Sequence, residues 1–132
     1  MFTRAYDGFQ RLGVAVTTGL ALAGIAACDE RLGDTETARH GYQRLRLDAE
    51  SSGEMGLTAT ALEGLARAAL TDGDPTGAAE LLARAAAIRD THDRPASPGE
   101  AAATSATVAA LDRALSETVD PPEEIERRPV NP

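Results

Sequence analysis

Side chains that could carry out chemistry are few and scattered in this 132-residue sequence. The single cysteine is Cys28, and the two histidines are His40 and His92. A zinc site needs several Cys or His ligands at short, regular spacing, and the sequence has no such pair. His92 lies between Asp90 and Asp93, a pattern that could contribute to a weak cation site, but a solvated loop is the more frequent context. We therefore expect no metal site.

Catalytic and cofactor-binding motifs are also missing from the sequence. All 13 basic residues are arginine, so a phosphate-binding glycine-rich loop with its lysine cannot form. The acidic residues Asp29 and Glu30, and likewise Asp72 and Asp74, fit helix ends and caps better than a general acid and base. No nucleophile and base can be nominated together. The sequence predicts a protein that is not an enzyme and takes no cofactor.

Cys28 has two interpretations. The apolar run Gly13–Ala27 before it resembles a lipoprotein signal, in which the cysteine is lipidated and anchors the protein to a membrane. Asp7 dilutes the charged start of such a signal, Thr17 and Thr18 interrupt the apolar run, and the run is too short to span a bilayer. We favour a small buried residue over a reactive or lipidated thiol. A small membrane-anchored lipoprotein lipidated at Cys28 is the alternative.

Composition favours helices and argues against nucleic acid as a partner. Alanine is the most frequent residue, aromatic residues make up 3%, and strand-favouring side chains are scarce. The net charge of -8 opposes a phosphate backbone, and the arginines are spread along the chain. One cysteine forms no internal disulfide, so nothing requires an oxidising compartment. We expect a cytoplasmic protein that binds neither nucleic acid directly nor a membrane.

The sequence contains an internal repeat with an offset of 40 residues. The offset aligns Leu22, Gly24, Ala26, Gly33, Asp34 and Ala38 with Leu62, Gly64, Ala66, Gly73, Asp74 and Ala78, and it places Cys28 opposite Ala68. In each copy a helix-period apolar segment ends at Gly33 or Gly73, where glycine can take the left-handed conformation. The aspartate that follows can cap the next helix. Each copy therefore predicts a helical hairpin, over about 14–49 and about 55–91.

A third helical unit is predicted after the second hairpin. Ser97, Pro98 and Glu100 provide an N-cap serine, a first-turn proline and a glutamate placed for a capping box. Val108, Leu111 and Leu115 recur at helical spacing, which predicts a capping helix over about 97–118 that covers the open end of the array. Residues 119–132 are polar and rich in proline, which predicts a disordered tail.

Residues around the two glycine turns resemble the signature positions of tetratricopeptide repeats (TPR). These residues are Leu22, Ile25, Ala26, Ala38, Tyr42 and Leu45 in the first copy, and Leu62, Leu65, Ala66, Ala69, Ala78, Leu82 and Ala85 in the second. The second copy also looks similar to the C-terminal arrays of LuxR-type and antibiotic-regulatory bacterial transcriptional activators. Asp29 and the 40-residue period depart from the TPR pattern. The resemblance implies an all-α domain over 1–118, built of antiparallel helical hairpins stacked as a short TPR-like solenoid with a C-terminal capping helix.

In the TPR family, the first helix of each hairpin lines a concave binding face. The matching polar positions, which are the predicted partner-binding residues, are Glu30, Arg31, Thr60, Glu63, Arg67 and Thr71. Ala23 and Ala27 stand where a carboxylate clamp would need basic residues, so the expected occupant is a helix or a neighbouring domain, oriented by Arg31 and Arg67. The resemblance implies a non-catalytic protein–protein interaction module with a regulatory role.

The first residues of the chain are predicted to form a separate helix. The 40-residue offset places Gly13 opposite Gly53, so residues 1–12 correspond to the second helix of an earlier hairpin. Its partner helix is not in the sequence, and this end should expose an apolar face. We expect a homodimer through this end, another protein or peptide, or an upstream domain of the same protein to cover that face.

Overall fold

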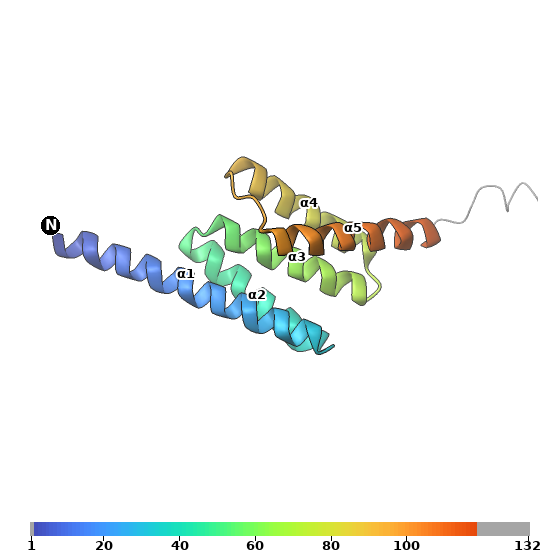
Figure 1. The fold of residues 1–132 in the computed structure, drawn as a ribbon, viewed down its shortest axis with the longest axis horizontal. Coiled ribbons are helices and arrows are strands. Elements are labelled where there is room, and N and C mark those ends of the chain that lie inside the picture. The colour runs from blue at the N-terminus through green and yellow to red at the C-terminus, as the bar shows by residue number, and fades with distance from the viewer. Residues whose placement is uncertain (1, 119–132) are drawn as a thin grey trace, which may run out of the picture.

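The computed structural model describes residues 2–118, which form five α-helices and no strand (Figure 1). The helices are α1 (Phe2–Arg31), α2 (Thr35–Ser52), α3 (Met55–Thr71), α4 (Pro75–Thr91) and α5 (Pro98–Thr118). The expected all-α fold is confirmed for these residues. The tail predicted over 119–132 lies outside the described residues.

Neighbouring helices in the sequence are also neighbours in space. α1 packs on α2, α2 on α3 and α3 on α4, and α5 lies against α3 and α4. Because the turns between the first four helices are short, each helix runs antiparallel to the one before it. α3 contacts all four other helices, and it has more buried residues than any other helix in the described chain. The fold is therefore organised around α3.

The turns at Gly33 and Gly73 have the predicted left-handed glycine, with a φ of 81° at each. The other two turns are closed by Gly53, with a φ of 75°, and by Asp93, with a φ of 50°. In all four turns the amide after the left-handed residue donates a hydrogen bond to the carbonyl five residues back. Asp93 is a non-glycine residue in this conformation, which aspartate tolerates better than most.

Helix caps form where the sequence places them. The Asp34 and Asp74 side chains each accept a hydrogen bond from the backbone amide three residues on, at 3.2 and 2.9 Å. At the start of α5, the Ser97 amide donates to Oε1 of Glu100 at 3.1 Å, and the Glu100 amide donates to Oγ of Ser97 at 3.2 Å. The predicted capping box is therefore confirmed.

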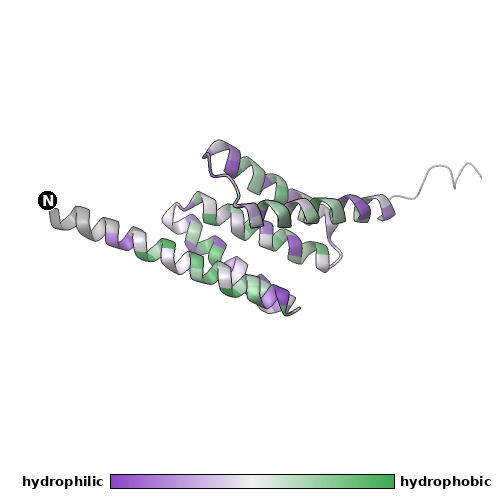
Figure 2. Ribbon diagram, viewed as in Figure 1, coloured by the Kyte–Doolittle hydropathy of each residue, from purple (hydrophilic) through white to green (hydrophobic). Residues whose placement is uncertain are grey.

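The core lies on both sides of α3 and is built largely of small residues. Tyr42, Leu45 and Leu62 are the largest fully buried side chains of the described chain. One cluster joins α1, α2 and α3, a second joins α3 and α4, and a third brings Leu111 of α5 against α3 and α4. Figure 2 shows hydrophobic stretches along the helices between hydrophilic ones. The many alanines in these clusters allow the helix axes to approach closely.

Two predictions for the first helix are wrong. α1 begins at Phe2 and continues through Gly13, so the separate helix predicted before Gly13 does not form. A glycine inside a helix costs only about 1 kcal/mol, and the unbroken backbone hydrogen bonding outweighs that cost. Cys28 is exposed rather than buried. Its counterpart Ala68 is buried because α2 covers that face of α3, whereas no helix of the described chain covers the same face of α1.

One residue of the predicted capping helix also differs from expectation. Leu111 is buried and Leu115 packs beside it, as predicted, but Val108 is exposed. The buried stripe of α5 runs through Thr107 and Leu111, one turn apart. Val108 follows Thr107 by one residue, about 100° around the helix, and therefore lies at the edge of the contact.

Candidate partner-binding groove

A groove with a volume of about 790 Å³ runs between α1, α3 and the first turns of α5. The turn between α4 and α5 closes one end of the groove through Asp93, Arg94 and Pro95. The groove is partly open to solvent. Most of its walls come from α1, α3 and α5, with Tyr42 of α2 and Arg89 of α4 also lining it, so the stacking of the helices creates the groove.

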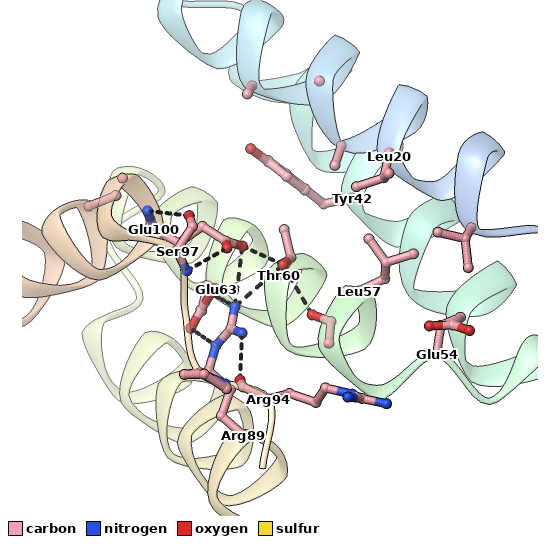
Figure 3. A pocket seen from close by; sticks show the side chains of 18 of the residues that line it. Leu20, Tyr42, Glu54, Leu57, Thr60, Glu63, Arg89, Arg94, Ser97 and Glu100 are labelled. Atoms are coloured by element: carbon pink, nitrogen blue, oxygen red, sulfur yellow. Dashed lines mark hydrogen bonds and ion pairs between the residues drawn. The ribbon is translucent and has the colours of Figure 1, made fainter. Parts of the chain in front are cut away.

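The apolar part of the lining comes mainly from α1. Its members are Val16, Leu20, Ala23 and Ala27 of α1, Leu57 of α3 and Ala103 of α5. Figure 3 shows Leu20 and Leu57 pointing into the same space from opposite helices. Leu20 is 60% exposed, which is unusual for a leucine that faces a neighbouring helix. This wall offers contact area to a ligand without unfolding any helix.

Three side chains connect α1, α2 and α3 at the wall of the groove, and two of them, Tyr42 and Arg67, line it. The Tyr42 hydroxyl donates a hydrogen bond to Oε1 of Glu30 at 2.9 Å. The Arg67 guanidinium grips the same carboxylate through Nε at 2.7 Å and Nη2 at 3.2 Å, and Nη2 also donates to the Tyr42 hydroxyl at 3.2 Å. The guanidinium carbon of Arg67 lies 5.7 Å from the centre of the Tyr42 ring. Arg67 therefore holds three helices together.

The electrostatics of this cluster keep Arg67 charged and Tyr42 neutral. Burial and the hydrogen bond to the Glu30 carboxylate raise the pKa of Tyr42, because both disfavour a phenolate. Burial opposes the charge on Arg67, but hydrogen bonding and attraction to Glu30 outweigh that effect and raise its pKa. With both protonation states fixed, the cluster is suited to a structural role.

A second cluster joins α3, α4 and α5. The Arg89 guanidinium holds the Glu63 carboxylate at both oxygens, with distances of 2.9 Å from Nε and 2.8 Å from Nη2. Nη2 also lies 3.2 Å from Oε2 of Glu100, and Nη1 donates to the Arg94 carbonyl at 3.0 Å. The Thr60 hydroxyl donates to the same oxygen of Glu100 (Figure 3). Glu63 is only 7% exposed, so Arg89 is the partner that makes its burial possible.

Stability of the α5 contact should depend on pH through Glu100. Burial alone would raise the pKa of this carboxyl, but hydrogen bonds from Thr60 and Ser97 and the charge of Arg89 lower it below the ordinary 4.5. A carboxyl with a lowered pKa in the folded state adds stability above its unfolded pKa, and this contribution disappears as pH falls below 4.5. We expect Glu100→Gln, which keeps the capping box, to melt below the unsubstituted protein at pH 7.

The difference in melting temperature between these two proteins should shrink as the pH is lowered toward 3. As the pH falls toward the lowered pKa of Glu100, a growing share of the carboxyl is protonated and resembles the glutamine. Thermal melts followed by circular dichroism across this range measure the difference directly. A difference that stays constant with pH would contradict the assignment of the charge to Glu100.

The structure distributes the six predicted partner-binding residues over three environments. Arg31, Thr60, Glu63 and Arg67 line the groove, as do Ala23 and Ala27. Glu30 is engaged by Arg67 and Tyr42 behind it. Thr71 is exposed outside the groove, and its hydroxyl donates to the Arg67 carbonyl of its own helix. Within the described chain, Arg31 alone of the charged residues in this set forms no ion pair.

Sequence reasoning did not assign several residues that shape the groove. Leu20 and Leu57 form its apolar wall, and Arg89 and Glu100 form its charged end. Leu57 lies within the predicted second hairpin without an assigned role, and Glu100 was recognised only as a capping residue. Their convergence depends on contacts between residues 26 to 40 positions apart, for which the sequence has no local signal.

Two further properties bear on the kind of site. Among the described residues, no group of three or more His, Cys, Asp and Glu side chains is arranged to hold a metal ion. One helical segment of this part of the chain, Gly13–Arg31, is long and apolar enough to cross a membrane by length and composition, a test that signal sequences and core helices also pass. Ala26 in this segment is fully buried against α2.

Comparisons with protein-family models, with curated proteins and with solved structures found no match to this chain.

Proposed function

We propose that this chain is a non-catalytic protein–protein interaction module, a short TPR-like solenoid that binds a helix of a partner in the groove between α1, α3 and α5. The groove itself carries this proposal, because it combines an exposed apolar wall with a free guanidinium at Arg31. Consecutive antiparallel packing and four turns of one geometry support the solenoid.

The dimensions and charges of the groove favour one kind of occupant. The apolar wall extends along α1 from Val16 to Ala27, which is about 16 Å, or roughly three turns of a bound helix. An amphipathic helix presents apolar side chains at such intervals. Glu63 and Arg67 are already paired, so the free charge available to a ligand at the α1 end is Arg31. The occupant is therefore an amphipathic helix with an acidic residue near one end.

The biological part of the proposal rests on the resemblance to regulatory arrays. In that setting the bound helix belongs to a protein or peptide partner, or to another domain of the same protein, and the module works in the cytoplasm in a regulatory role. The lipoprotein alternative requires cleavage before Cys28, which would remove Leu22 and the fully buried Ala26 from the core between α1, α2 and α3. The packing of α1 therefore favours the interaction module.

A displayed library of amphipathic helical peptides tests the proposal. We expect selection on this protein to enrich peptides with an apolar stripe and an acidic end, and Leu20→Glu should reduce their affinity at least about tenfold. Arg31→Glu should weaken the acidic peptides selectively. Leu47→Glu is the matched control, because Leu47 is 67% exposed on α2 outside the groove. Peptides that bind the Leu20 variant as well as the Leu47 variant would refute the groove as the site.

A further inference from the structure

A second uncovered surface lies on α1 and is distinct from the groove wall at Leu20. We call it the α1 stripe; it consists of Val14, Thr18, Ala21, Ile25 and Cys28 of α1, and Leu32, which directly follows the helix. Intervals of four and three residues place these side chains on one face of the helix. All six are exposed, including Val14 at 64%, Ile25 at 61% and Leu32 at 83%. Half of the exposed large hydrophobic residues of the described chain therefore lie on one stripe.

The matching face of α3 shows what such a stripe accepts. The four inner residues of the stripe run from Thr18 to Cys28. At the 40-residue offset they correspond to Thr58, Ala61, Leu65 and Ala68, and all four of these are buried. The helix that covers this face is α2, which runs antiparallel to α3. Its buried residues pack in one cluster with Ala61 and Leu65. Small residues at this face let the helices approach closely. The inner part of the α1 stripe has the same pattern, with small residues around the larger side chain of Ile25. No helix of the described chain covers it.

We propose that a second copy of this chain covers the stripe, with the two α1 helices antiparallel. The intervals of the stripe, four, three, four, three and four, read the same in both directions. An antiparallel pair therefore places Val14 opposite Leu32 of the second copy, Thr18 opposite Cys28, and Ala21 opposite Ile25. Each contact occurs twice, as a two-fold interface requires. The central pairs set a small side chain against a larger one, which allows interdigitation.

Charges beside the stripe are compatible with this register. Asp29 faces the small Ala15 of the second copy, and Arg31 faces Thr17, so no like charges meet at these positions. Arg11 lies one turn before Val14 and comes close to the start of α2 in the second copy, where Asp34 and Glu36 are exposed. This arrangement brings opposite charges together at both ends of the pair.

A membrane is a less suitable partner for the stripe. The net charge of -8 opposes the negative surface of a cytoplasmic leaflet. A second face of α1 packs on α2 and a third lines the groove, so the stripe itself is narrow. A narrow seam with a heptad-like period is typical of helix pairing.

Sedimentation equilibrium provides the first test. We expect a concentration-dependent species of twice the 13.7 kDa monomer mass. Ile25→Glu should abolish that species while circular dichroism shows an unchanged helix content, because Ile25 is exposed within one chain. Leu47→Glu, at an exposed leucine of α2, should leave the dimer intact. A monomer at all concentrations, or a dimer that survives Ile25→Glu, would overturn the proposal, as would an α1-dependent association found only with phosphatidylcholine–phosphatidylglycerol vesicles.

Disulfide cross-linking tests the register. Thr18→Cys creates a thiol opposite Cys28 of the second copy, so mild oxidation should convert most of the protein to a covalent dimer with two bridges. The unsubstituted protein should cross-link poorly, since its two Cys28 residues lie ten positions apart along the pair, or about 15 Å. Leu47→Cys is the control for random collisions. Equal cross-linking in all three proteins would rule out this pairing.

The groove proposal and the dimer proposal can be refuted independently of each other. The peptide-binding test depends on Leu20 and the dimer test on Ile25, which lie on different faces of α1. Loss of the dimer in Ile25→Glu with peptide binding retained would leave the groove proposal intact. A dimer without selected peptides would support the stripe and refute the groove.

Discussion

Arg89→Met is expected to lower the free energy of unfolding by about 3–5 kcal/mol, because it leaves a buried carboxylate without its partner. Glu63 is 7% exposed, and both of its oxygens are held by Arg89. The methionine keeps much of the apolar stem but donates no hydrogen bond. Because small domains have only about 5–15 kcal/mol of stability in total, urea denaturation should show a large fall in the midpoint.

Two controls separate the buried charge from general effects of the substitution. Arg44→Met removes an exposed pair with Asp48, at 3.7 Å, and should change stability by no more than about 0.5 kcal/mol. The double variant Arg89→Met with Glu63→Met removes the buried charge as well, and should recover a large part of the loss. If Arg89→Met and Arg44→Met had similar midpoints, the pair between α3 and α4 would not be important for stability.

Gly64→Ala is the second substitution with a large expected effect. A Cβ at this position would lie 2.6 Å from atoms of the Tyr42 ring, which is far inside contact distance. The ring is buried, and its hydroxyl is tied to Glu30 and Arg67, so it has no free direction in which to move. We expect a net loss of about 1–3 kcal/mol from overpacking, even though alanine is the better helix former.

Gly24→Ala is the matched control, since Gly24 occupies the same place in the first copy of the repeat. A Cβ there meets nothing within 4 Å. The substitution should therefore stabilise the chain by about 0.5–1 kcal/mol through helix propensity alone. Thermal or urea unfolding of the two variants should give opposite signs. A stabilising Gly64→Ala would show that the Tyr42 ring does not pack on α3 as described.

Element boundaries were predictable wherever a few adjacent residues determine the geometry. Gly33 and Gly73 end their helices because glycine adopts the left-handed conformation without steric cost, and the aspartate that follows each caps the next helix. The capping box at Ser97 and Glu100 is equally local. Such signals operate within four or five residues, so they do not depend on the rest of the fold.

Exposure on α1 was not predictable from the residues of α1. Cys28 and Ile25 occupy the same positions of the repeat as their buried counterparts Ala68 and Leu65, and a covering helix is present only over the second pair. Gly13 was misjudged for a related reason, since glycine marks the end of a helix only when the following residues turn away. Burial is a property of the packed array, which a local reading of the sequence does not contain.

The candidate site was predictable in position but not in the roles of its charges. The resemblance placed Arg31, Thr60, Glu63 and Arg67 on one face, and these residues do line the groove. It treated Arg67 as a free binding group, whereas Arg67 is committed to Glu30 and Tyr42. Ion pairs that span 26 to 37 residues arise from the stacking of helices, and no spacing rule assigns them.

The packing of each helix on its neighbour in the sequence also affects how the chain is made. α1 and α2 can bury their shared surface once residue 52 has emerged from the ribosome, and each later helix adds to a structure that already exists. Contacts of low sequence separation close quickly, on the microsecond to millisecond scale typical of helical domains. The hairpins can therefore fold on the ribosome in the order of translation, with the α1 stripe available to a second nascent chain before α5 has been completed.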